Sequence, residues 1–152
     1  MGELFEKIYK AEANVKGELE ISDKKKQGYI NFITRTEENN GCDCYVKDDT
    51  LQGKEKGKAI IIGDTTSTCF YQEEDFYSGD HIVVCRAKWI NKYTAIFLKT
   101  LLERERYRYS YGRAFKMDLI KETVVKLPTK EGKPDFLFME NYIKALPYGD
   151  RI

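Results

Sequence analysis

The sequence has little of what catalysis requires. Its 152 residues include a single histidine, His81, which lies in an apolar run. No glycine-rich phosphate loop of the Walker type occurs, and no Gly-x-Ser-x-Gly turn presents a nucleophilic serine. His81 is explained better as a hydrogen-bonded structural residue of a strand than as a base. Its pairing with a cysteine nucleophile stays open as a distant alternative. We therefore expect no catalytic residues and no cofactor.

The sequence also lacks a long apolar run and a secretory signal, so we expect a cytoplasmic protein with no membrane contact. Thiols stay reduced in that compartment. The four cysteines lack the spacing of zinc ligands, because one residue separates Cys42 from Cys44 and only one histidine is available. We expect thiols in the core or on the surface, and no metal site.

Charge of one sign is not in excess. The chain has 26 lysines and arginines against 25 aspartates and glutamates, which gives a net charge of +1. A nucleic-acid-binding domain usually has a clearly basic face. The charges are nevertheless segregated along the chain, with an acidic stretch at 73–80 and basic stretches at 54–58 and 104–116. The charge pattern permits nucleic-acid binding without requiring it.

What the sequence does contain is a series of short strand signals in its first 90 residues. A chain of this length with 41% hydrophobic residues suits one folded domain. Asn39-Asn40-Gly41 predicts a turn, because Asn and Gly tolerate positive φ. The polar stretches 18–27 and 48–58 predict exposed loops. Runs rich in β-branched and aromatic residues predict strands at 29–34, 42–46, 59–63, 68–71 and 81–85.

The pattern changes after residue 90. Apolar residues recur at helical spacing over 91–106, where Asn91 can cap the start of a helix. Residues 124–127 predict a further strand, and Asp135 can cap a final helix. Strands first and helices late predict an α+β fold. We expect a single domain over residues 1–152, with a twisted mixed or antiparallel sheet, packed helices and a C-terminal or connecting helix that begins near Asp135.

Alternating arginine and tyrosine over 106–113 is the strongest binding signal. Arginine pairs with phosphate, or bidentately with guanine, and tyrosine can stack or bridge to phosphate. The run is equally consistent with a solvated basic turn at a helix C-terminus, where the helix dipole favours cations. Two loops offer weaker signals of the same kind: 34–41, with hydroxyl, amide and guanidinium groups, and 52–58, with three lysines. Each also fits an ordinary solvated loop.

Acidic residues near the end of the chain do not indicate a nuclease. In the metal-dependent nuclease motif the acid and the lysine lie two residues apart on one strand. Here Glu140 and Lys144 lie four residues apart on the expected final helix. An ion pair between positions i and i+4 on the helix surface explains them better.

Several segments, taken in order, resemble one family. The run 29–36, followed by Asn39-Asn40-Gly41, resembles the family's G-x-I-P-F-I-T and N-N-G opening, with Asn31 in place of the usual proline. The block 69–82 resembles its central F-Y-Q and F-x-x-x-D-H-I block, and the stretch 109–143 resembles its closing block. From about residue 28 onward, the chain is similar to specificity subunits of type I restriction systems, and more closely to recognition domains of type IIG and BcgI-like restriction-modification enzymes.

The resemblance implies a target recognition domain whose loops enter the DNA major groove and read half of a bipartite site. Such domains act with methyltransferase and restriction subunits, often as two domains separated by long helices. A homodimer would read a palindromic site, because site symmetry mirrors protein symmetry. The glycine-rich cofactor motif and the Asn-Pro-Pro-Tyr motif of DNA amino-methyltransferases are absent, so the chain itself is not expected to methylate.

The resemblance also suggests which residues would contact double-stranded DNA. Asn39, Asn40 and Gly112 can serve backbone geometry alone. A protein-interaction or adaptor domain of the same fold, which binds a methyltransferase rather than DNA, is the alternative that the near-neutral charge supports. The candidates for phosphate contacts are Lys54, Lys56, Lys58, Arg104 and Arg106. The candidates for base contacts are Arg35, Thr36, Asn39, Gln72, Arg108, Tyr109, Ser110 and Arg113.

Overall fold

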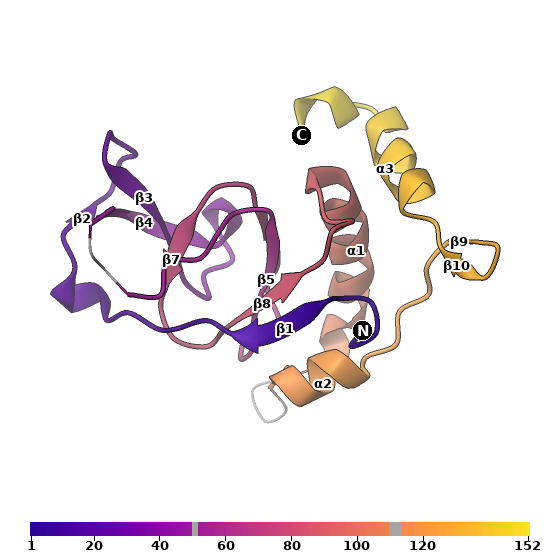
Figure 1. Cartoon of the computed structure of the whole chain (residues 1–152), viewed down its shortest axis with the longest axis horizontal. Helices are drawn as coiled ribbons and strands as arrows, with labels where there is room; N and C mark the ends of the chain where they lie inside the picture. The colour runs from indigo at the N-terminus through magenta and orange to yellow at the C-terminus, as the bar shows by residue number, and fades with distance from the viewer. Residues whose placement is uncertain (50–51, 110–113) are drawn as a thin grey trace.

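The structure, a computed structural model, describes residues 1–49, 52–109 and 114–152 (Figure 1). The described residues form two four-stranded sheets, a two-stranded ribbon and three α-helices, all after residue 91. This arrangement confirms the expected α+β class and the expected mixture of antiparallel and mixed pairing. The strands predicted from the aromatic and β-branched runs are present, with ends shifted by a residue or two.

The first sheet is antiparallel throughout. Its strands are, in spatial order, β1 (Lys7–Lys10), β8 (Ile82–Arg86), β5 (Ala59–Gly63) and β6 (Cys69–Gln72). Strand β5 is buried along its whole length, because the sheet is covered on both faces. A strand covered in this way reads as a continuous apolar run rather than an alternating one, which explains the sequence Ala-Ile-Ile-Ile-Gly.

The second sheet is mixed. Its spatial order is β2 (Ile21–Ser22), β4 (Cys42–Lys47), β3 (Tyr29–Ile33) and β7 (Phe76–Ser78). β3 pairs antiparallel with β4 and parallel with β7. A core of buried side chains from both sheets joins them, so the two sheets pack against each other.

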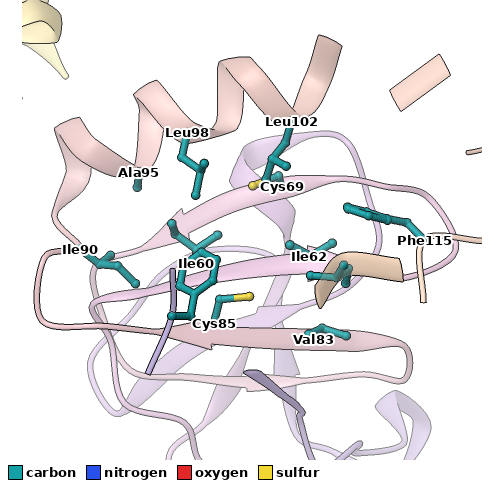
Figure 2. Packing of buried hydrophobic residues seen from close by; sticks show 12 residues of the cluster. Ile60, Ile62, Cys69, Val83, Cys85, Ile90, Ala95, Leu98, Leu102 and Phe115 are labelled. Carbon is teal, nitrogen blue, oxygen red and sulfur yellow. The ribbon is translucent and has the colours of Figure 1, made fainter. Parts of the chain in front are cut away.

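The main core lies between the first sheet and helix α1 (Lys92–Glu105), as Figure 2 shows. Ile60 and Ile62 project from one face of β5 toward Leu98 and Leu102 on the helix. The alternate residue Ile61 belongs to the core between the two sheets. This division follows from the two-residue period of side chains along a strand. The molecule therefore has three layers, which are helix, sheet and sheet.

Both predicted helix caps are present. The Asn91 side chain accepts hydrogen bonds from the backbone of Tyr93 and Thr94, and the Thr94 hydroxyl accepts one from the Asn91 backbone, which completes a capping box. Asp135 caps α3 (Phe136–Ala145) by accepting from the Phe138 backbone N–H. Trp89, just before α1, stacks on Phe136 with ring centroids 4.5 Å apart. This contact places α3 beside the start of α1.

The expected strand at 124–127 is wrong. These residues have no regular structure, and Val124 is 83% exposed, so no sheet uses its β-branched side chain. The chain instead forms α2 (Met117–Glu122) before them and a small ribbon of β9 (Thr129–Lys130) and β10 (Lys133–Pro134) after them. The turn of that ribbon contains Gly132, which adopts a φ of 75°.

Three further positions differ from expectation. The stretch 18–27 is not wholly a loop, because β2 pairs with β4 within it. Strand β7 was not predicted. His81 was expected inside a strand, but it precedes β8 and adopts a φ of 64°. Its ring is partly exposed and lies between two aspartates.

All four cysteines are reduced and buried in the core. Burial raises the pKa of Cys69 to about 12, so the thiolate is disfavoured there. Within the described ranges, no group of three or more His, Cys, Asp or Glu side chains is arranged to hold a metal ion. The same ranges contain no helix with the length and apolar character that a membrane crossing needs.

Candidate nucleic-acid interface

The β3–β4 loop and the β5–β6 turn meet at one edge of the molecule. The Arg35 side chain, exposed at the start of the loop, donates a hydrogen bond from Nη1 to Oγ1 of Thr65 at 2.8 Å. Thr36 is ordered locally, since its backbone N–H donates to the Thr34 hydroxyl and its own hydroxyl accepts from the Glu38 backbone. Hydroxyl residues commonly order loops in this way. Residues 34–38 are therefore held in a defined shape.

The end of α1 joins this edge. Arg106, in the short 3-10 helix (Arg106–Arg108) that continues α1, forms an ion pair with Glu37 of the β3–β4 loop. Arg35 and Arg106 are therefore brought together although 70 residues separate them in the sequence. We call the solvent-accessible surface made by Arg35, Thr36, Thr65, Arg104, Arg106 and Arg108 the arginine edge.

Two more cations extend the arginine edge. Arg104 is exposed on the last turn of α1, and within the described part of the chain it has no ion-pair partner. Arg108 contacts Glu105 at 2.8 Å, and its Nε donates to the hydroxyl of Tyr107 at 3.0 Å. The Tyr107 hydroxyl and the Glu105 carboxylate raise the pKa of Arg108 further, so its side chain stays charged. Tyr107 is 76% exposed and lies under the guanidinium.

The ion pairs of the arginine edge leave its cations accessible to an anion. Ion pairs between exposed side chains contribute only about 0–1 kcal/mol, because water screens both charges. The side chain of Arg108 is 58% exposed and that of Arg106 39%. A phosphate or a guanine edge can therefore replace Glu37 or Glu105 at small cost. The ion pairs with Glu37 and Glu105 hold the guanidinium groups in position, and an anionic ligand can displace the two carboxylates.

The predicted turn at 39–41 has a structural role. Asn39, Asn40 and Gly41 all adopt positive φ, between 46° and 78°, as the sequence predicted. Asn39 donates its side-chain amide to the Cys42 carbonyl at 3.1 Å. Asn40 donates to the Tyr71 carbonyl at 2.7 Å, and Gln72 donates back to the Asn40 carbonyl at 2.8 Å. These bonds fasten the turn to β6.

Gln72 and Tyr109 are both engaged within the domain. Gln72 is 2% exposed and its amide holds the turn, so it presents nothing to a base in this conformation. Tyr109 stacks on Phe115 with ring centroids 4.2 Å apart, and its hydroxyl shares a hydrogen bond with Thr123 at 2.8 Å. The remaining base candidates from the arginine–tyrosine run, Ser110 and Arg113, lie outside the described residues.

The three lysines of the 53–58 loop lie at the other end of β5 from the arginine edge, because the loop precedes Ala59 and the Thr65 turn follows Gly63. Lys54 pairs with Asp48 at 2.7 Å, which raises its pKa, and Lys56 pairs with Asp75 at 3.1 Å. The structure therefore does not gather all the predicted phosphate candidates into one patch.

Buried contacts hold this lysine loop in place. Arg86 of β8 forms an ion pair with Glu55 at 2.9 Å and donates to the backbone carbonyls of Lys56 and Gly57. The Tyr9 hydroxyl donates to the same Glu55 carboxylate at 2.6 Å. Since both charged side chains are largely shielded from water, this pairing is not an ordinary surface contact. The loop is a fixed part of the surface.

A groove of about 900 Å³ runs between β6, the start of α1 and the 39–41 turn. Sequence reasoning did not anticipate it, because its walls come from segments far apart in the chain. Lysines such as Lys58 and Lys99 line it, but so do acids such as Glu73 and Glu140. Acids also lie on the arginine edge, so the type of cation separates the two surfaces: the groove offers lysines, which lack the planar, bidentate geometry of guanidinium groups. The arginine edge is therefore the better nucleic-acid candidate.

Comparison with known proteins identifies the family. The model of the type I restriction modification DNA specificity domain matches residues 1–147, so the chain belongs to that family. The chain is 28% identical over 124 residues to a protein of Heyndrickxia coagulans described as the specificity subunit S.BcgI of a type II restriction enzyme. The match covers 80% of this chain and 36% of that relative. No solved structure matches the chain significantly.

Family membership assigns this chain a specificity role rather than a catalytic one. It agrees with the resemblance seen in the ordered motifs. Because the chain spans about a third of the length of the relative, the activities of a whole restriction-modification enzyme are not carried over to it.

Proposed function

We propose that this domain recognises a short sequence in double-stranded DNA through its arginine edge, as part of a restriction-modification system. The observation that carries the proposal is the convergence of Arg35 and Arg106 at one exposed edge, in a chain of the DNA specificity family. Guanidinium groups suit this role, because they bind phosphate and can also pair bidentately with guanine in the major groove.

Within this proposal, the position of each residue decides whether it contacts a base or a phosphate. Arg35 and Thr36, held at the start of the β3–β4 loop, contact base edges, and Arg108 does so from the end of α1. Arg104 and Arg106 contact the phosphates on either side. The lysine loop at 53–58 makes a second, more distant phosphate contact through Lys54, Lys56 and Lys58. The recognised unit is one half of a bipartite site, and the domain directs a partner methyltransferase or endonuclease to it.

These assignments predict different effects for loss of a phosphate contact and loss of a base contact. Arg106→Ala should weaken binding to all sequences and lower the slope of log affinity against log salt concentration by about one, because one phosphate contact is lost. Arg35→Ala should weaken binding by about 1–3 kcal/mol on the preferred sequence and relax one base position. Lys130→Ala, a charge loss on the β9 strand away from the arginine edge, is the matched control. Equal losses in all three variants would contradict the assignment.

We further propose that α3 provides the contact with a second protein chain, as the connecting helix of this domain. The helix and the residues directly after it carry exposed apolar side chains. A group of exposed apolar side chains close together in the sequence is typical of a protein interface. Phe138 and Tyr142 stack with centroids 6.1 Å apart, so part of the surface is preformed. The exposed residues are Leu137, Phe138, Tyr142, Leu146 and Tyr148.

The occupant that we propose for this surface is a second copy of the chain. A two-fold dimer would place two arginine edges on one duplex and read a palindromic bipartite site. The same apolar surface is the observation that favours the alternative function, an adaptor that binds a methyltransferase rather than DNA. DNA binding that is absent, or that does not depend on salt, would favour this alternative.

A further inference from the structure

We propose that the β5–β6 turn at 64–67 supports sequence reading by positioning an arginine: the Thr65 hydroxyl fixes the direction of the Arg35 guanidinium toward a base. This inference rests on the proposed DNA-recognition function and extends it to residues that the sequence did not single out. The contact that carries it is the hydrogen bond from Arg35 Nη1 to Thr65 Oγ1, 2.8 Å long, between loops of two different sheets.

Thr65 acts on Arg35 by restricting its motion. An arginine side chain has many rotamers, and a base-specific contact requires the guanidinium plane to match the acceptor pair of one base edge. With Nη1 committed to Thr65, the other guanidinium N–H groups keep a fixed direction and remain available to a base. A side chain ordered before binding loses less conformational entropy when the contact forms. Thr65 is thus a positioning residue for Arg35.

The turn itself is built tightly enough to hold Thr65 in place. A Cβ on Gly63 would lie 2.5 Å from Thr68 Oγ1 and 2.6 Å from Thr66 Oγ1, so only glycine leaves space for these two hydroxyls. They lie 3.0 Å apart and share a hydrogen bond across the turn. Ser67 adopts a φ of 57°, which closes the turn, and its N–H donates to the Gly63 carbonyl at 2.8 Å.

His81 contacts Asp64, the first residue of the turn. Its Nδ1 lies 3.0 Å from Oδ1 of Asp64, which is buried and accepts no well-directed hydrogen bond from the described residues. The Asp64 backbone N–H donates to the His81 carbonyl at 3.0 Å. Asp80 contacts the other ring nitrogen at 3.2 Å. The backbone hydrogen bond therefore joins the first residue of the turn to the residue that precedes β8, and the Asp64 carboxylate lies against the His81 ring.

The test is base discrimination measured on the sequence that the wild-type chain selects from a randomised duplex. Affinities are determined for that duplex and for each single base-pair change. Thr65→Val keeps the branched shape but removes the hydroxyl, and we expect it to lose roughly 5- to 100-fold discrimination at one base pair, with small change elsewhere. Thr65→Ser keeps the hydroxyl and should restore discrimination. Thr129→Val, an exposed threonine on β9, is the matched control.

A double-mutant cycle separates positioning from a general structural effect. In an Arg35→Ala background, Thr65→Val should have no further effect on discrimination, because its action passes through Arg35. Additive effects, or an equal loss for Thr65→Val and Thr65→Ser, would overturn the inference. Unchanged discrimination in Thr65→Val, with a wild-type chain that selects a motif, would overturn this inference and leave the proposed function intact. A wild-type chain that selects no motif would overturn both.

Discussion

Gly57 shows how one residue can decide the shape of the surface. It lies in the lysine loop, where its backbone N–H donates to Asp75 at 2.9 Å and its carbonyl accepts from Arg86 at 3.2 Å. A Cβ at this position would overlap the backbone carbonyl of Glu73. The requirement is therefore for close approach of two backbone segments. It explains a glycine that the sequence alone marks only as a loop residue.

Gly57→Ala should accordingly destabilise the domain by about 1–3 kcal/mol, because the added methyl group forces the loop away from residue 73. The measurement is the free energy of unfolding from urea denaturation. Gly17→Ala is the matched control, since a Cβ there meets no atom within 4 Å. It should change stability by less than about 0.5 kcal/mol. Similar effects of the two substitutions would show that the close approach at Gly57 is not required.

Residue types in the candidate site could be chosen from the sequence, but their contacts could not. The arginines at 35 and 106 could be chosen by residue type, because guanidinium groups bind phosphate. Their contacts with Thr65 and Glu37 could not, because each pair is separated by at least 30 residues. Gln72 was chosen for its amide group, but its burial depends on the 39–41 turn folding over β6. No local pattern reports that contact.

At the scale of elements, the start of α1 couples local and tertiary structure. Asn91 caps the helix with its side-chain oxygen and donates its amide group to Glu140 of α3 at 2.9 Å. Asn91→Ala should destabilise the domain by about 0.5–2 kcal/mol through loss of the cap. Asn91→Asp keeps the capping oxygens but brings a second carboxylate to Glu140.

We expect Asn91→Asp to preserve helix content while weakening the attachment of α3. Hydrogen exchange of the amides in α1 and α3 distinguishes the two effects. Asn91→Ala should lower protection in the first turn of α1, whereas Asn91→Asp should lower it mainly in α3. Uniform loss of protection in both variants would show that capping and attachment are not separable.

The lysine loop should depend on pH through Asp75. The backbone N–H of Gly57, and then Lys56, lower the pKa of this carboxyl below its usual value near 3.8. The folded state thus favours the charged form. The stabilisation is present above the unfolded pKa and is lost as pH falls through the folded value. Protonation of Asp75 in acid should therefore weaken the contacts that Asp75 makes with Gly57 and Lys56 of the lysine loop, whereas at neutral pH these contacts stay intact.

Asp75→Asn removes this titration. Unfolding measured between about pH 3 and 6 should show a gap in stability between wild type and variant that narrows as pH falls. Glu131→Gln, an exposed charge loss on the β9–β10 turn, serves as control and should show no such trend. A gap that widens toward low pH would have the wrong sign for a carboxyl with a lowered pKa.

Which elements could be predicted follows from their length and pattern. The runs that form β3, β4 and β5 are each at least five residues long, so their β-branched and aromatic composition predicts a strand. Both predicted helices begin after a capping residue that the sequence shows. Strand β7 has three residues, and it pairs with β3 in parallel from a distant position in the chain. Val124 and Val125 have strand composition, but no strand within the described ranges pairs with them, so composition alone misled there.

At the scale of the whole molecule, the net charge is near zero because many cations and anions cancel, but these charges are not mixed evenly over the surface. The arginine edge lies at one end of β5 and the lysine loop at the other, while helix α3 lies on the far side of α1 from the sheets (Figure 1). One end would meet DNA and one side a protein. This separation explains how a chain with a net charge of +1 can present a cationic site.

The proposed dimer gives a direct test at this scale. In sedimentation equilibrium, the chain should have twice its 17.8 kDa mass. Phe138→Ser with Leu137→Ser should return it to the monomer, because both side chains are exposed on α3. Val124→Ser removes an exposed apolar side chain elsewhere and should leave the dimer intact. A wild-type chain that is monomeric at all concentrations would rule out self-association. The α3 surface would then be assigned to a methyltransferase partner.

The central claim, that the domain reads DNA sequence, is tested most directly by selection. The purified chain is allowed to bind a pool of randomised duplex DNA at two salt concentrations, and the bound duplexes are sequenced. Our account predicts enrichment of one short motif at both concentrations, with total binding that falls steeply as salt rises. Binding without enrichment, or no binding at either concentration, would contradict sequence recognition by this chain.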